Sequence, residues 1–131
     1  MIVLDASVLI AVLIPQDMHH HFAASLVAGA ISSSQNLLVN PVTLAEALVF
    51  PAREGRARVA EQVAALAELG VTEVPFPPGA AGDLAMLRIT ELRMPDRCVL
   101  LTALDRQAVL ASIDDQLRRA AHAHGVRLAF V

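Results

Sequence analysis

The sequence MIVLDASVLIAVLI, residues 1–14, begins with a short aliphatic run at residues 2–4 that the acidic Asp5 interrupts. Three aliphatic residues are too few for a helix and are typical of a strand that is buried on both faces. Residues 6–14 continue in a helix-compatible pattern until Pro15 ends it. In parallel α/β sheets, where strands pass directly into helices, ligands sit beyond the carboxyl ends of the strands. Asp5 is therefore expected where chemistry takes place.

The same order of short strand and helix recurs along the chain. Strands are expected at residues 2–4, 37–39, 71–75, 108–111 and 126–131, and helices at about 6–14, 22–31, 41–51, 53–69, 80–92, 94–105 and 116–124. Every strand except the last is followed by a helix, which implies parallel pairing through right-handed crossovers. We therefore predict an α/β, three-layer sandwich in which a central parallel sheet of about five strands is flanked by helices, as one domain of residues 1–131.

Composition narrows the possible functions. The apolar share is 56%, so we expect a partner or a second copy to cover some apolar surface. A net charge of -3 argues against a broadly basic nucleic-acid module, although not against a nuclease whose carboxylates hold metal. The chain contains no lysine, so its non-histidine basic residues are all arginine, which can hold phosphate through two hydrogen bonds. Compositional bias explains this absence equally well.

The sequence predicts a cytoplasmic protein without a membrane partner. The apolar run at residues 6–14 is well short of the roughly 20 residues that a membrane span requires. No basic region precedes it, so we expect no signal peptide. The single cysteine, Cys98, excludes an internal disulfide and fits a reducing compartment. The consecutive histidines at residues 19–21 do not converge on one ion, so we interpret them as a solvated helix start.

Four acidic residues fall where this fold would bring them together. Asp5 and Asp114 follow strands, Glu46 lies on the helix after the second strand, and Asp96 opens a helix before the fourth. Neighbouring parallel strands are about 4.8 Å apart, so such side chains can reach one ion. Oxygen ligands without His or Cys suit Mg²⁺ or Mn²⁺. Although a helix cap or a turn would explain each acid alone, their joint placement predicts a metal site, with a nuclease as one of several functions.

Four short motifs occur in a fixed order along the chain: Leu4-Asp5-Ala6-Ser7, Glu46 in an apolar helix, Pro95-Asp96 before an aliphatic helix, and Ser112-Ile113-Asp114 after a late strand. Taken together, they resemble the PIN-domain family, and most closely the VapC-like toxin ribonucleases of toxin–antitoxin pairs. Each motif is degenerate by itself, whereas their order and spacing are fairly specific. The resemblance covers essentially the whole chain.

The resemblance implies a function and a set of site residues. It matches Asp5, Glu46, Asp96 and Asp114 to the acids that hold Mg²⁺ or Mn²⁺ and activate water, and Ser7 to a small polar position that supports them. The implied activity is cleavage of RNA, often a tRNA or an rRNA loop. The implied partners are a VapB-like antitoxin, whose tail covers the active-site groove, and a second copy in a homodimer.

Two residues depart from the family pattern. Arg97 follows Asp96 where the family usually has a small or apolar residue, so it could contact RNA or weaken a metal site. Asp115 stands beside Asp114 and could replace it as the ligand, although Asp114 has the family spacing from Ser112. Further candidate phosphate contacts, which solvated helix faces explain equally well, are Arg53, Arg56, Arg58, Arg93, Arg118 and Arg119.

Arg97 keeps open an alternative, a non-catalytic PIN-like module that binds RNA or a partner protein. Other small α/β families fit less well. A phosphoacceptor signalling domain would need a lysine near its last strands, and the chain has none. A phosphatase of the haloacid-dehalogenase type would need an aspartate where Ser7 stands, and no glycine-rich phosphate loop is present.

Overall fold

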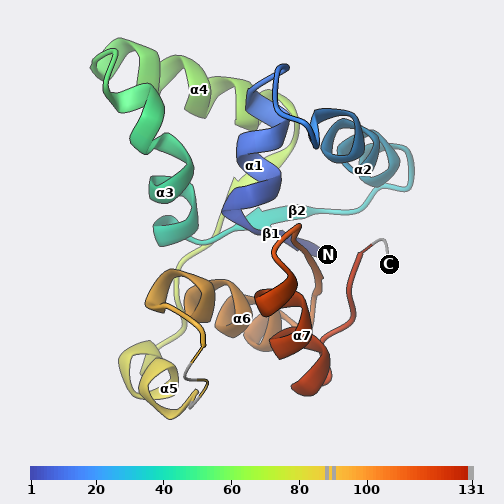
Figure 1. Ribbon diagram of the computed structural model, residues 1–131, viewed down its shortest axis with the longest axis vertical. Helices are drawn as coiled ribbons and strands as arrows, with labels where there is room; N and C mark the ends of the chain where they lie inside the picture. The colour runs from blue at the N-terminus through green and yellow to red at the C-terminus, as the bar shows by residue number, and fades with distance from the viewer. Residues whose placement is uncertain (88, 90, 130–131) are drawn as a thin grey trace.

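The computed structural model describes residues 1–87, 89 and 91–129, and in this part of the chain a parallel sheet lies between two layers of helices (Figure 1). The strands are β1 (Ile2–Leu4), β2 (Leu37–Val39), β3 (Val71–Glu73) and β4 (Val109–Ala111). The helices are α1 (Ala6–Leu13), α2 (His20–Ser32), α3 (Pro41–Ala52), α4 (Arg56–Glu68), α5 (Ala80–Met86), α6 (Met94–Arg106) and α7 (Asp115–Ala123).

The strands are arranged in the order β3-β2-β1-β4, and all three pairings are parallel. In the register, Leu4 of β1 pairs with Ala111 of β4, so these two strands end side by side. The backbone N–H of Asp5 extends this ladder by donating to the carbonyl oxygen of Ala111 at 3.0 Å. The segments that follow β1 and β4 therefore leave the sheet next to each other.

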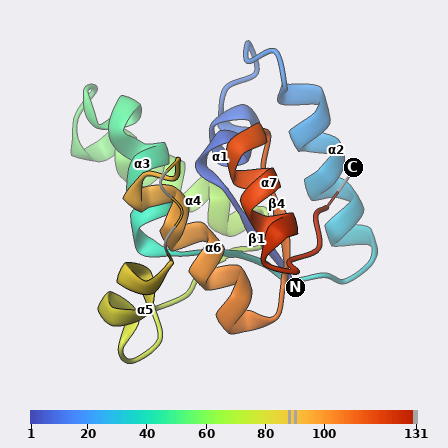
Figure 2. The same cartoon turned by 60° about the horizontal axis from the view of Figure 1, so that its bottom comes forward.

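Alternation along each strand divides the core into two layers. In β1, Ile2 and Leu4 pack against α1 and α2, whereas Val3 faces the opposite side, where α6 and α7 lie. In β4, Ala111 packs on the side of α1 and α2, and Leu110 packs on the side of α6 and α7. The helices on the second side are α5, α6 and α7, with α6 and α7 packed against each other (Figure 2). The three-layer α/β sandwich predicted from the sequence is thus confirmed.

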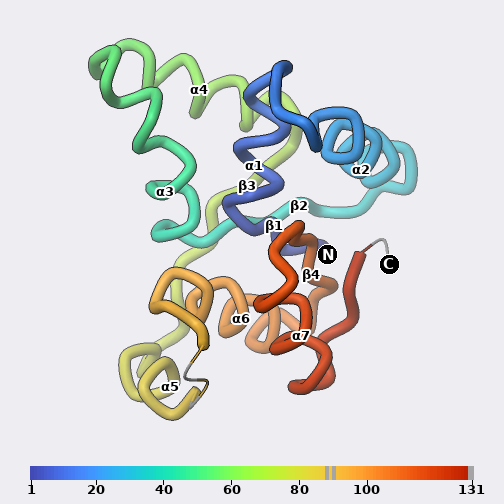
Figure 3. The backbone as a smooth tube through the Cα atoms, viewed as in Figure 1, coloured from blue at the N-terminus to red at the C-terminus, as the bar shows by residue number. Residues whose placement is uncertain are grey.

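The carboxyl-terminal segment differs from the expected fifth strand, residues 126–131. The described part of this segment makes one isolated parallel bridge, between Leu128 and Leu110, on the outer side of β4 (Figure 3). Backbone hydrogen bonds join Leu110 to Arg127 and Ala129 there. Residues 130 and 131 lie outside the described part of the chain. The sheet therefore has four strands with a short extension at the β4 edge.

The helix expected at residues 80–92 ends earlier, at Met86. Leu92 lies beyond the end of α5. Its side chain is buried in the same part of the core as Val99 and Leu100. The guanidinium of Arg97 fixes this segment by donating to the carbonyl oxygens of Leu92 and Ile89, both at 3.1 Å.

Two further differences concern helix boundaries. The helix expected from residue 53 begins at Arg56, because Gly55 adopts a φ of 104° that interrupts the helical path. Helix α2 begins at His20, and the half-buried His20 ring bonds through Nδ1 to the carbonyl oxygen of Ala11 at 2.7 Å. This histidine therefore joins α2 to α1, whereas the sequence interpretation had it solvated. In the described residues, no helix combines the length and hydropathy needed to cross a membrane.

Candidate active site

Asp5 is fixed at the carboxyl end of β1 by two serine hydroxyls. Its Oδ2 atom accepts hydrogen bonds from Ser7 Oγ at 2.7 Å and from Ser112 Oγ at 2.8 Å. The residue is only 5% exposed, and its Oδ1 atom makes no hydrogen bond within the described part of the chain. Because both hydroxyls hold the same oxygen, the other oxygen is oriented and available to a ligand.

Both serines also hold the loop that follows β4. Ser112 Oγ accepts from the backbone N–H of Asp114 at 3.0 Å, and Ser7 Oγ accepts from the N–H of Ile113 at 3.1 Å. Ser112 is buried and links residues of two strand ends. The sequence analysis used Ser112 only as part of a motif and gave it no role. The signal that could have identified it was a small polar residue directly after an apolar strand.

Asp114 caps helix α7. Its Oδ1 atom accepts from the backbone N–H groups of Gln116 at 2.8 Å and Leu117 at 3.3 Å, which satisfies donors in the first turn of the helix. Asp115 is exposed in that turn, where its charge is favourable to the helix dipole. Of these two neighbours, Asp114 is the one whose charge acts on Asp96.

Helix α3 carries Glu46 toward the same edge of the sheet. The helix starts directly after β2, where the buried Asn40 side chain accepts from the N–H of Thr43 at 2.8 Å and Pro41 occupies the first turn. Burial raises the pKa of Glu46, and the Asp5 carboxylate raises it further. Arg93 opposes this shift, because its Nη2 atom lies 3.8 Å from Oε1 of Glu46.

Asp96, in the first turn of α6, is affected by all three of the other acids. Burial raises its pKa to about 6, and the charges of Asp5, Asp114 and Glu46 contribute to the increase. Arg93 partly offsets it, as it does for Glu46. Asp96 therefore lies within electrostatic reach of the other three acids predicted from the sequence, and the four side chains come from four separate segments. Arg93, considered before only as a phosphate contact, is the cation that faces them.

The donors of these four acids are of the right kind for a hard cation, since all are carboxylate oxygens. A cation would also relieve the repulsion that raises the pKa of Asp96. Among the described residues, however, no three His, Cys, Asp or Glu side chains are gathered closely enough to hold an ion as they stand. Joint ligation would therefore require carboxylates to turn. The buried carboxylate of Asp96 makes no hydrogen bond within the described part of the chain, so no such bond would have to break for it to turn.

Arg97 does not have the environment expected for an RNA contact or for a charge that competes with a metal ion. Its guanidinium is half-buried and donates to two backbone carbonyl oxygens, those of Leu92 and Ile89. The cations that act on the pKa of Asp96 include Arg93 and not Arg97. Arg97 thus holds the chain that leads into α6.

An apolar groove adjoins the acids on the side of α1, α3 and α4. It has a volume of about 410 Å³, and Glu46 lies at its edge together with Ile10, Leu13, Ala47 and Phe50. Phe50 is 61% exposed, which is high for a large aromatic side chain. Arg53 covers one face of the Phe50 ring, with its guanidinium carbon 5.4 Å from the ring centroid.

Comparison with known proteins identifies the family. The family model for the PIN domain matches residues 2–123. A search of curated proteins found no match. Among solved structures, the chain is similar to the sarcin-ricin loop cleaving toxin VapC20 from Mycobacterium tuberculosis, with a TM-score of 0.72 at 16% identity over 92% of this chain and 95% of that one.

Two further structures have similar folds. VapBC2 from Rickettsia felis, bound to a DNA fragment from its promoter, matches with a TM-score of 0.71 at 14% identity over 98% of each chain. FitAcB from Neisseria gonorrhoeae matches with a TM-score of 0.70 at 20% identity, over 99% of this chain and 97% of that one. The sheet and its covering helices thus have the fold of VapC-type proteins, and the chain belongs to the PIN domain family.

Proposed function

We propose that the chain is a metal-dependent endoribonuclease, the toxin of a VapBC-like pair, and that it cleaves RNA by attack of water on a phosphodiester. The observation that carries this proposal is the raised pKa of Asp96, which burial above all, together with the charges of the other three acids, brings to about 6. Clustered acids with raised pKa values are characteristic of functional sites rather than of solvated surfaces.

The proposed ligands of Mg²⁺ or Mn²⁺ are Asp5, Glu46, Asp96 and Asp114. Such an ion, when bound, would supply a water of lowered pKa and neutralise charge on the phosphate. Asp5 would provide the fixed point, because Ser7 and Ser112 hold one of its oxygens and leave Oδ1 oriented. Asp114 would contribute from the start of α7 while it continues to cap the helix through Oδ1.

We also infer two protein partners in the cytoplasm, an antitoxin of the VapB type and a second copy of the chain. Two of the similar structures, VapBC2 and FitAcB, support a partner of this kind. The apolar groove at α1, α3 and α4 is a suitable surface for the antitoxin, because it is large, exposes Phe50 and includes Glu46. RNA of the ribosomal or transfer type is the proposed substrate, and the similar VapC20 is a toxin that cleaves the sarcin-ricin loop.

The test is cleavage of an RNA pool by the purified chain without any partner. We expect fragments in Mg²⁺ or Mn²⁺, none in EDTA, and none from Asp5→Asn, whose fold should stay intact because the amide keeps the shape of the carboxylate. Glu68→Gln, an exposed acid on α4, is the matched control and should cleave normally. Equal cleavage in EDTA would disprove metal dependence. RNA binding without any cleavage would favour the non-catalytic module instead.

A further inference from the structure

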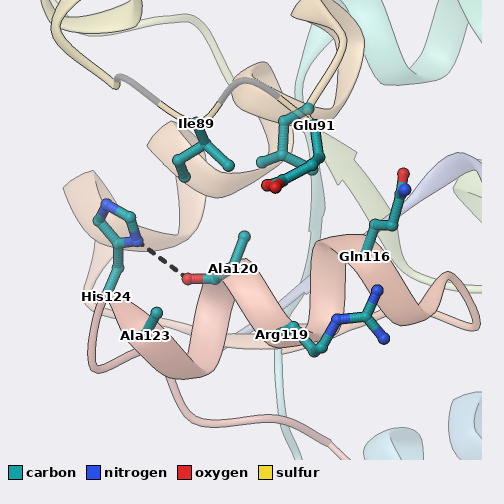
Figure 4. A pocket seen from close by; sticks show the side chains of 8 residues that line it. Ile89, Glu91, Gln116, Arg119, Ala120, Ala123 and His124 are labelled. Atoms are coloured by element: carbon teal, nitrogen blue, oxygen red, sulfur yellow. Dashed lines mark hydrogen bonds between the residues drawn. The ribbon is translucent and has the colours of Figure 1, made fainter.

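A second hollow lies on the other side of the sheet from the apolar groove, between α7 and the segment that leads into α6. It is bounded by Ile89, Glu91 and Leu92 on one wall and by α7 on the other, and its volume is about 330 Å³ (Figure 4). This volume is at the lower end of the range of about 300–1,000 Å³ that is usual for small-molecule sites. The hollow is thus large enough for one small planar group.

Both walls of this hollow lead into the candidate active site. Leu92 directly precedes Arg93, the cation that faces Glu46. On the other wall, Gln116 is in the first turn of α7, and its N–H binds the Asp114 carboxylate. The hollow extends along α7 from Gln116 to His124, about 12 Å at the usual helical rise. Both walls of the hollow are therefore continuous in sequence with residues of the candidate active site.

The lining combines an apolar floor with unpaired polar groups. Leu92 and Ala120 are buried, at 3% and 8% exposure, and form part of the floor. The side chains of Glu91, Gln116 and Arg119 are exposed and make no hydrogen bond or ion pair within the described part of the chain. The fourth polar residue is His124, whose Nδ1 lies 2.9 Å from the carbonyl oxygen of Ala120.

This lining suits a nucleobase that is attached to a phosphate. Unpaired RNA bases are bound by packing on apolar side chains and by hydrogen bonds to their edges. A carboxylate accepts hydrogen bonds and donates none, so Glu91 would select a base with an exocyclic amino group. Arg119 could hold the adjoining phosphate through two hydrogen bonds. Glu91 disfavours a free anion as the occupant, and the small volume disfavours a protein helix.

We propose that this hollow is a specificity site for one unpaired nucleotide next to the cleaved bond, in which Glu91 reads an amino-bearing base and Arg119 holds its phosphate. The proposal rests on the proposed ribonuclease function and deepens it, because it assigns the residues that choose the cleaved sequence. Uracil is the disfavoured base, since its single N–H is flanked by two carbonyl oxygens that would repel the Glu91 carboxylate.

The experiment measures RNA binding without cleavage, in the Asp96→Asn background with Mg²⁺. The probes are fluorescent oligouridylates in which guanosine, adenosine or cytidine replaces one uridine at each position in turn. At one position, an amino-bearing base should tighten binding about tenfold, and Glu91→Gln should remove most of this preference. Arg119→Gln should weaken binding of every probe about fivefold and reduce the salt dependence of the affinity. Glu68→Gln, exposed on α4, and Arg106→Gln, in the last turn of α6, are the matched controls.

If Glu91→Gln keeps the full base preference, or if Arg119→Gln shows the same salt dependence as Arg106→Gln, this site is overturned. If the wild-type chain still cleaves RNA in that case, the ribonuclease function stands and only the specificity site is wrong. If the wild-type chain neither cleaves nor binds any RNA, both proposals are wrong. Circular dichroism of each variant checks that its fold is retained.

Discussion

Arg93 and Glu46 form an ion pair across the candidate active site, with Nη2 of the arginine 3.8 Å from Oε1 of the glutamate. The two residues come from separate segments, since Arg93 precedes α6 and Glu46 is on α3. The Arg93 side chain is 74% exposed, so the pair contributes little to stability. Its effect is electrostatic, because Arg93 lowers the pKa of both Glu46 and Asp96.

Replacement of Arg93 should therefore change the titration of the acids. We expect Arg93→Gln to raise the pKa of Asp96 above its value of about 6 and to raise that of Glu46 in the same direction. Carboxyl carbon shifts in an NMR titration of the metal-free protein would measure both. Arg106→Gln, at the opposite end of α6, is the control and should leave both values unchanged. An unchanged pKa of Asp96 in the Arg93→Gln variant would contradict the electrostatic role of Arg93.

The raised pKa of Asp96 makes the metal-free protein sensitive to pH. The folded protein keeps this proton up to about pH 6, whereas the unfolded chain releases it near its ordinary value of 3.8. The contribution of Asp96 to the free energy of unfolding therefore falls as pH rises from about 4 to 6. In EDTA at neutral pH, Asp96→Asn should melt a few degrees above wild type, and the difference should vanish near pH 4. If Asp96→Asn and wild type had equal Tm values at neutral pH as well as near pH 4, the raised pKa of Asp96 would be refuted.

Metal binding should stabilise the fold through the same acids. Any ligand that binds only the folded state stabilises it by mass action, by about 2.7 kcal/mol at a hundred times its Kd. We expect millimolar Mn²⁺ to raise Tm relative to EDTA, and Asp5→Asn to lose most of this increase. Glu68→Gln, remote on α4, should keep it. If Mn²⁺ did not change the Tm of the wild-type protein, this would argue against a metal site at these acids.

Ser112 should be needed both for stability and for cleavage. Ser112→Ala removes one hydrogen bond to the Asp5 carboxylate and one from the Asp114 N–H. Loss of bonds to a buried charged group should lower the free energy of unfolding by about 1–3 kcal/mol. Cleavage should fall at least about tenfold because Asp5 Oδ1 is no longer oriented. Urea unfolding and RNA cleavage would measure these effects. Ser33→Ala, at the exposed end of α2, should change neither.

Arg97 should prove to be a structural residue. Arg97→Met breaks its two hydrogen bonds to the carbonyl oxygens of Ile89 and Leu92 and should destabilise the fold by about 1–3 kcal/mol. Because neither bond involves a phosphate, the salt dependence of RNA binding should stay as in wild type. Salt titrations in the Asp96→Asn background would measure it. A reduced salt dependence would instead support the RNA contact considered from the sequence.

The sequence by itself determined the fold class and the four candidate acids. Local patterns indicated the fold class, because three aliphatic residues before Asp5 are typical of a short buried strand and Pro41 after Asn40 starts a helix. The expected fold and the family resemblance then singled out the four acids. Boundaries were less well determined where a distant partner decides them. Helix α5 stops at Met86, and the following Leu92 and Ile89 are held by Arg97.

Only the tertiary structure decided how the acids are held and which cation faces them. Ser112 reaches Asp5 across 107 positions of the chain, and Arg93 meets Glu46 from a separate segment. The hollow at Glu91 and Arg119 likewise exists only because α7 folds back beside the start of α6. Burial and the charge of remote neighbours set the pKa of Asp96, and neither quantity is a property of local sequence.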